Sequence, residues 1–220
     1  MKKHSLSAEI IIFFVIFFLF IVSSFVSLYY SWQFGVNNKI FTEWSFPWQQ
    51  MILSAFCLVT LLIFYEKSEK RTLVLFPVIM SFGLLFCTSL LCKALSVLLE
   101  TSGQNEMLTV QKPESLLQWI FCIFTFLFAA FNEEVIYRFY LADKMYQLLS
   151  LKIRWKILRV ICEILTLLFF AFAHLYLGWI SVLNAALAHI ILRLCFLKNE
   201  KLWPCVASHF IYNIVSLILL

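Results

Sequence analysis

Seven apolar segments alternate with short polar stretches along the chain. Read from the amino end, they cover residues 8–32, 46–65, 73–98, 116–142, 157–177, 179–197 and 203–219. One helix needs about 20 predominantly apolar residues to cross a bilayer, and each of these segments is close to that length. The pattern therefore predicts an all-α fold, a polytopic transmembrane helix bundle of about seven spans.

The composition excludes a water-soluble globular domain. Hydrophobic residues make up 63% of the chain and charged residues 13%, whereas soluble domains carry about 25% charged residues. The polar stretches are too short to fold alone, so we expect one transmembrane domain over residues 1–220. All seven cysteines lie in apolar runs without a CxxC pair, which indicates core or lipid-facing positions.

The charged residues predict the orientation of the bundle. Short loops on the cytoplasmic side of a membrane protein are enriched in lysine and arginine. With the amino terminus in the cytoplasm, only Lys39 and Lys112 fall in loops on the opposite side. We therefore expect an integral, multi-pass protein, and the short chain with compact loops favours a bacterial plasma membrane. The net charge of +5 is explained by this topology, so we expect the lipid bilayer as a partner and no nucleic acid. The cytoplasmic side would carry Lys2, Lys3, Lys67, Lys70, Arg71, Lys144, Lys152, Arg154, Lys156, Arg159, Lys198 and Lys201.

The fourth segment contains two adjacent carboxylates, Glu133 and Glu134, followed by Arg138. Glu134 and Arg138 are spaced i,i+4 on one helix face, which is the favourable order for an ion pair. Glu133 is turned about 100° away and has no partner in its own segment. Because a charge inside a bilayer is costly, Glu133 either acts as a general base or accepts a hydrogen bond from another helix.

Polar residues also interrupt the fifth and seventh segments. Phe170 and His174 lie one turn apart on one face, and His209 and Asn213 repeat that spacing. Either histidine alone is compatible with a simple packing role. Together with Glu133, they supply a carboxylate, two imidazoles and an amide on three spans, which suffices to deprotonate a water and hold an oxyanion.

Other polar residues inside the segments are expected to have structural roles. Lys93, Glu163 and Arg193 lie within about two turns of a segment end, where long side chains reach the interface. His189 forms a second His-x-x-x-Arg spacing with Arg193, preceded by Asn184. Hydrogen bonding between helices or contact with a substrate would each explain these residues.

Three motifs in the carboxy-terminal half, residues 116–220, resemble the CPBP family of intramembrane proteases. This family includes the type II CAAX prenyl endopeptidases and the bacterial abortive-infection (Abi) proteins. The motifs read Glu133-Glu134-x-x-x-Arg138, Phe170-x-x-x-His174 and His209-x-x-x-Asn213, in that order and on separate segments.

The resemblance implies an intramembrane endopeptidase acting on peptide, membrane-protein or prenylated substrates. Glu133 and His174 would then activate a water, and His209 and Asn213 would form the oxyanion hole. Glu134 and Arg138 would hold the motif helix, with Phe170 in support. We expect no cofactor, because no His-Glu-x-x-His helix is present; the alternative is a zinc held by Glu133, His174 and His209.

The predicted boundaries place the site residues at different depths. Glu133 lies in the cytoplasmic half of the fourth segment and His174 toward the outer end of the fifth, roughly 15 Å apart at 1.5 Å per residue. The site closes only if the fifth segment starts near Glu163, or if helices are tilted, broken or short.

Two other functions fit the same residues. One is a non-catalytic membrane protein that binds a partner, such as a bacteriocin-immunity-type protein of the same fold. The other is a proton-coupled carrier, which the absence of an internal repeat makes less favourable.

Overall fold

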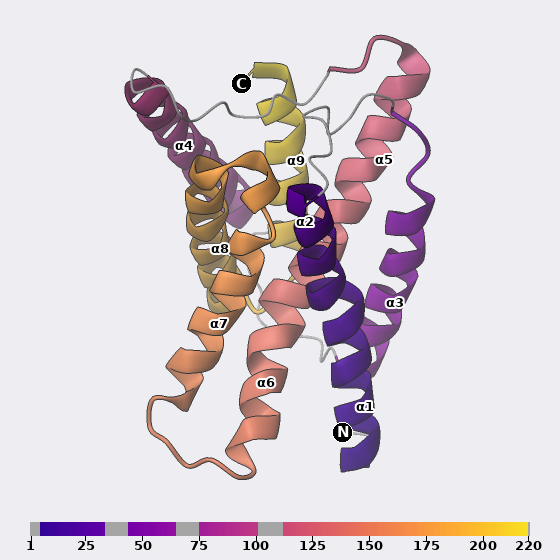
Figure 1. Ribbon diagram of the computed structural model, residues 1–220, viewed down its shortest axis with the longest axis vertical. Helices are drawn as coiled ribbons and strands as arrows, with labels where there is room; N and C mark the ends of the chain where they lie inside the picture. Colours follow the sequence, from indigo (N-terminus) through magenta and orange to yellow (C-terminus); the bar gives the residue numbers. More distant parts are fainter. Residues whose placement is uncertain (1–4, 34–43, 65–74, 101–111, 220) are drawn as a thin grey trace.

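The computed structural model describes residues 5–33, 44–64, 75–100 and 112–219, and within these ranges every regular element is helical (Figure 1). The predicted all-α class is therefore confirmed. Some elements follow one another without a break, so that the described residues form seven continuous helices. The elements are α1 (Leu6–Ile16), η1 (Phe17–Val22), α2 (Ser23–Gln33), α3 (Trp48–Phe64), α4 (Leu75–Glu100), α5 (Leu116–Glu133), η2 (Glu134–Tyr140), α6 (Leu141–Ser150), α7 (Leu158–Phe172), η3 (Leu175–Leu177), α8 (Trp179–Asn199) and α9 (Trp203–Leu219).

Several of these helices are suited to a membrane. By length and apolar composition, Leu6–Tyr29, Leu75–Leu99, Leu116–Ser150 and Trp179–Asn199 are candidate spans. Helices α3 and α9 are equally apolar but shorter. The chain thus has the helices of an integral membrane protein, while seven crossings and a cytoplasmic amino terminus stay predictions. The basic residues Lys2, Lys3, Lys39, Lys67, Lys70 and Arg71, on which that orientation partly rests, lie outside the described residues.

The expected end of the fourth segment, at residue 142, is wrong. Helix α5 continues through η2 into α6 and ends at Ser150. Polar residues do not stop this helix, because they find partners on other helices. Lys144 Nζ lies 2.8 Å from a carboxylate oxygen of Glu9 on α1, and Asp143 pairs with Arg159 on α7.

This longer helix removes the predicted difference in depth between the site residues. Helices α6 and α7 run antiparallel and are joined by a short loop (Figure 1). From Glu133 to the end of α6 is about 26 Å, and from the start of α7 at Leu158 to His174 is about 24 Å. By length along these two antiparallel helices, the two residues are at similar depths, although α7 does not begin near Glu163 as one alternative required.

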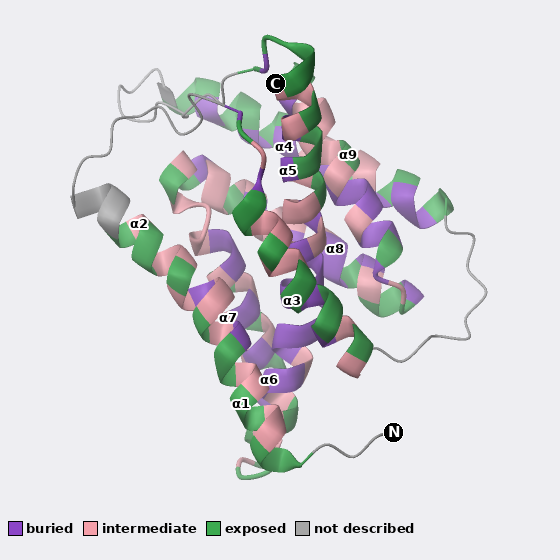
Figure 2. Ribbon diagram, turned by 90° about the vertical axis from the view of Figure 1, so that its right-hand side faces the viewer, coloured by how far each residue is buried: buried purple, intermediate pink, exposed green. Residues whose placement is uncertain are grey.

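The rest of the bundle is packed mainly through α8 and α5. Helix α8 packs against α4 and α7, and α5 packs between α3 and α9. Leu192 of α8 is completely buried in a cluster with Leu85 of α4, and Ile136 and Leu141 are completely buried in a second cluster that includes Phe170 of α7. The outward faces carry exposed apolar side chains such as Leu62 and Leu91, as expected of a surface in contact with lipid (Figure 2).

Candidate active site

The first motif lies where the long fourth helix changes from α-helical to π-helical winding. Residues Glu134–Tyr140 form the π-helical segment η2, directly after Glu133. Such segments occur frequently at functional sites. Asn132 fixes the preceding turn against α3, because its side chain donates to the carbonyl of Gln50 (3.1 Å) and accepts from the Ser54 hydroxyl (2.7 Å).

Glu134 and Arg138 are the most buried of the predicted site residues. The Glu134 carboxylate and the Arg138 guanidinium are both fully buried, with Oε2 and Nε 3.3 Å apart. This confirms the predicted ion pair. The other oxygen, Oε1, lies 2.8 Å from Nδ1 of His209 on α9. Because a carboxylate only accepts hydrogen bonds, Nδ1 of His209 carries a hydrogen atom and donates a hydrogen bond to Glu134.

Glu133 occupies a different environment from its neighbour. Its side chain is 29% exposed, and Oε2 lies 3.9 Å from Nε2 of His209. The imidazole thus stands between the two carboxylates, with one nitrogen directed to each. Oε2 itself is buried and has no hydrogen-bond partner among the described residues, so this oxygen is unsatisfied and available to a polar group that enters the site.

The second motif forms one compact turn at the end of α7. His174 Nδ1 lies 2.9 Å from the carbonyl oxygen of Phe170, which leaves Nε2 free for chemistry. The buried Phe170 ring lies 4.8 Å from the His174 ring, and the Arg138 guanidinium lies 4.0 Å over its centre. Phe170 therefore connects the second motif to the first.

Asn213 lies one turn after His209 on α9 and is half-buried. Within the described ranges, no hydrogen bond joins its side chain to His209 or to another residue. Its amide is therefore available to an incoming group, although its predicted role in an oxyanion hole stays a prediction.

We expected the Arg193 side chain to reach the membrane interface, but it does not. Its side chain is only 5% exposed, and its guanidinium bonds Glu163 on α7 at 2.6 and 3.0 Å and Asp143 on α6 at 3.1 and 3.2 Å. It also donates to the backbone carbonyl of Arg138. Arg193 thus ties three helices to the π-helical segment. Lys93, in contrast, is exposed as expected.

His189 and Asn184 do not contact the three motifs through hydrogen bonds. Asn184 donates to the hydroxyl of Tyr212 on α9 (2.9 Å), which is the hydrogen bonding between helices that the sequence allowed. His189 is buried with its ring 5.6 Å from Phe170, but among the described residues its Nδ1 has no hydrogen-bond partner.

We expect Arg193→Ala to destabilise the protein strongly. Breaking a buried ion pair costs about 3 to 5 kcal/mol, and the lower value applies here because the two carboxylates are partly exposed. For a chain of this size, about 3 kcal/mol corresponds to a fall in Tm of roughly 6 to 12 °C. The fall in Tm is measured by thermal unfolding of the two proteins in detergent.

The exposed Arg154 provides the matched control, because it belongs to the loop between α6 and α7. Arg154→Ala should change Tm by less than about 2 °C. An Arg193→Ala protein as stable as this control would show that the ion pairs contribute little.

The predicted alternative of a zinc site concerns Glu133, His174 and His209. Among the described residues, no three His, Cys, Asp or Glu side chains gather as metal ligands. Nδ1 of His174 and Nδ1 of His209 are both engaged with protein acceptors. The ring nitrogens that stay available are the two Nε2 atoms.

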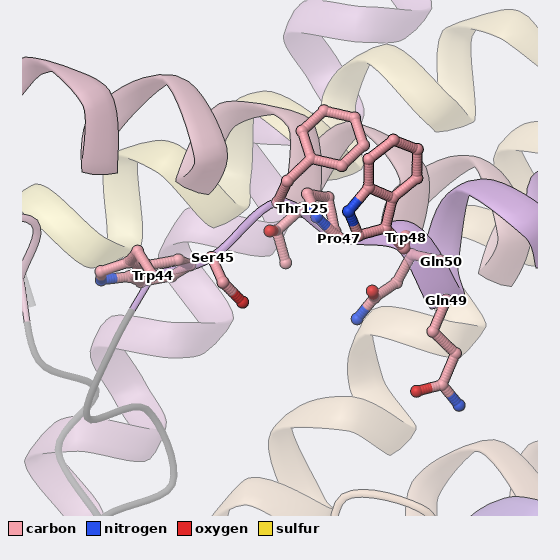
Figure 3. Close-up of a pocket in the computed structure, with 8 residues that line it drawn as sticks. Trp44, Ser45, Pro47, Trp48, Gln49, Gln50 and Thr125 are labelled. Carbon is pink, nitrogen blue, oxygen red and sulfur yellow. The ribbon is translucent and has the colours of Figure 1, made fainter.

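A small hollow lies beside the site rather than in it. It is formed at the start of α3, where Trp44, Trp48 and Gln50 approach Thr125 of α5 (Figure 3). None of the predicted site residues lines it. Its link to the site is indirect, through the bond between the Gln50 carbonyl and Asn132.

Sequence comparison supports the family resemblance. Residues 115–215 match a family model described as type II CAAX prenyl endopeptidase Rce1-like. This range contains all three motifs, from Glu133 to Asn213. The match gives no support to a relationship with abortive-infection proteins in particular. No curated protein and no solved structure matches the chain.

Proposed function

We propose that the chain is an intramembrane endopeptidase of the Rce1-like type II CAAX prenyl endopeptidase family, whose family model residues 115–215 match. The observation that carries this proposal is the arrangement of Glu133, Glu134 and His209. A partly exposed carboxylate faces an imidazole whose other nitrogen is fixed by a fully buried carboxylate. This is the arrangement of a base with an oriented partner.

In the proposed reaction, Glu133 takes a proton from a water molecule while the water oxygen bonds to the carbonyl carbon of the scissile peptide. His174 orients the same water through its free Nε2. His209 acts as an imidazolium: its Nδ1–H stays bonded to Glu134 while its Nε2–H, together with the Asn213 amide, donates a hydrogen bond to the oxyanion. The carbon–nitrogen bond then breaks, and the proton held by Glu133 passes to the departing amine.

The surroundings support this division of roles. Glu134 is neutralised by Arg138 and hydrogen-bonded by His209, so it is poorly placed to accept a further proton. Glu133 has no such fixed partner at hydrogen-bond distance. Two adjacent carboxylates with different environments commonly take different roles in catalysis.

We propose that the reaction needs no metal. The alternative, a zinc ion held by Glu133, His174 and His209, is not supported by their arrangement, because among the described residues these side chains do not gather as metal ligands. The substrates we propose are peptides or membrane-associated proteins, prenylated or not, that reach the site from the bilayer.

The proposal is tested by purifying the protein in detergent and measuring cleavage of a library of membrane-tethered peptides. Wild type and Glu133→Ala are compared, each with and without a chelator. We expect wild-type cleavage that the chelator does not affect and that Glu133→Ala abolishes. Chelator sensitivity would instead assign Glu133, His174 and His209 to a metal site. No cleavage by wild type would favour a partner-binding protein.

A further inference from the structure

A short turn directly after the second motif holds an aromatic residue beside the site. Residues Leu175–Leu177 form the 3₁₀ element η3 between α7 and α8. Leu177 N donates to the carbonyl of His174 (3.0 Å), and Gly178 N donates to that of Leu175 (2.9 Å). Gly178 has a φ of 96°, which other residues rarely adopt. The two hydrogen bonds and the glycine therefore fix the backbone conformation of this turn.

Tyr176, at the centre of the turn, packs its ring against a motif histidine. The ring centres of Tyr176 and His174 are 6.5 Å apart and the ring planes differ by 21°, a stacked arrangement. The Tyr176 side chain is 40% exposed. Within the described residues its hydroxyl has no hydrogen-bond partner, so that group is free to bind a molecule entering the site.

Tyr176 thus adjoins His174 directly, and its exposed position leaves the hydroxyl accessible to a substrate group that approaches this histidine.

We propose that Tyr176 is a further catalytic residue, whose hydroxyl donates a hydrogen bond to the scissile carbonyl oxygen of the substrate peptide. This inference rests on the endopeptidase function proposed above. A phenol normally loses its proton near pH 10, so Tyr176 is a donor at neutral pH. The bond strengthens as negative charge develops on the oxygen, which selectively favours the transition state.

The test is Tyr176→Phe, which removes the hydroxyl and keeps the ring that stacks on His174. A hydrogen bond to a developing charge is typically worth a factor of about 10 to 100 in rate. We therefore expect kcat to fall about 10- to 100-fold, with KM changed by less than about threefold. Peptide cleavage kinetics on the substrate found with wild type measure both constants, and thermal unfolding shows that the variant is folded.

Tyr146→Phe is the matched control, because Tyr146 lies on α6 and its ring contacts Arg159 away from the site. It should keep wild-type kcat. Wild-type kcat in Tyr176→Phe would overturn the role of Tyr176 while leaving the endopeptidase function intact. A rise in KM at unchanged kcat would also overturn it, since the residue would then contribute only to ground-state binding. Absence of cleavage by wild type would remove the endopeptidase function and this role with it.

Discussion

Replacing Glu133 with glutamine is expected to abolish peptide cleavage and leave substrate binding nearly unchanged. Glutamine keeps the size and the polar character of the side chain but cannot accept a proton from water. General-base catalysis contributes about a hundredfold to ten-thousandfold in rate, and we expect a loss toward the upper end because no other described carboxylate is equally placed. The measurement is kcat and KM on one peptide substrate, with Kd for the same peptide.

A second carboxylate in the bundle provides the control. Glu9 on α1 is paired with Lys144 and lies outside the site. Glu9→Gln should keep kcat within about threefold of wild type, although it removes one partly buried ion pair. If Glu133→Gln keeps substantial activity, Glu133 is not the base.

His209→Ala is expected to reduce kcat severely, but less than Glu133→Ala. The variant loses an oxyanion donor, which typically costs about a hundredfold to a thousandfold. It also leaves Oε1 of the fully buried Glu134 without its hydrogen-bond partner. We therefore expect a lower Tm as well, and both kinetics and thermal unfolding should be measured.

His209→Gln separates these two effects, because an amide can still donate a hydrogen bond. We expect it to recover part of the stability lost in His209→Ala. Equal and slight losses of kcat in Glu133→Ala and His209→Ala would contradict the roles assigned to both residues.

The helical elements are largely readable from the sequence, because apolar runs of bilayer length leave few alternatives. The predicted segment 203–219 coincides with α9, and 73–98 lies within two residues of α4 at each end. The predicted end of the fourth segment, at residue 142, is wrong for a specific reason. Asp143 and Lys144 resemble a loop in a hydropathy pattern, but their partners lie on α7, α8 and α1, which only the folded chain shows.

The candidate site was predictable where residues share one helix. The spacing of Glu134 and Arg138 correctly predicted their ion pair. The contact between His209 and Glu134 could not be predicted, because it depends on how α9 packs against α5 and η2.

The surroundings of two further residues could not be predicted from the sequence either. Arg193 reads as an interfacial residue by its distance from the helix end, yet its guanidinium is buried among Glu163, Asp143 and a backbone carbonyl. Tyr176 gave no signal in the sequence beyond its position two residues after His174. Only the 3₁₀ turn brings its ring against that histidine.

In the proposed mechanism, Glu133 activates a water molecule, which attacks the peptide directly. The most direct test is a single turnover of wild-type protein in ¹⁸O-labelled water, run in parallel with hydroxylamine and analysed by mass spectrometry. If Glu133 acts as a general base, we expect one ¹⁸O atom in the new carboxyl group of the product, no label on Glu133, and no hydroxamate product. A hydroxamate product, or ¹⁸O label on Glu133, would show that a side chain attacks the peptide first and that Glu133 is not a general base for water.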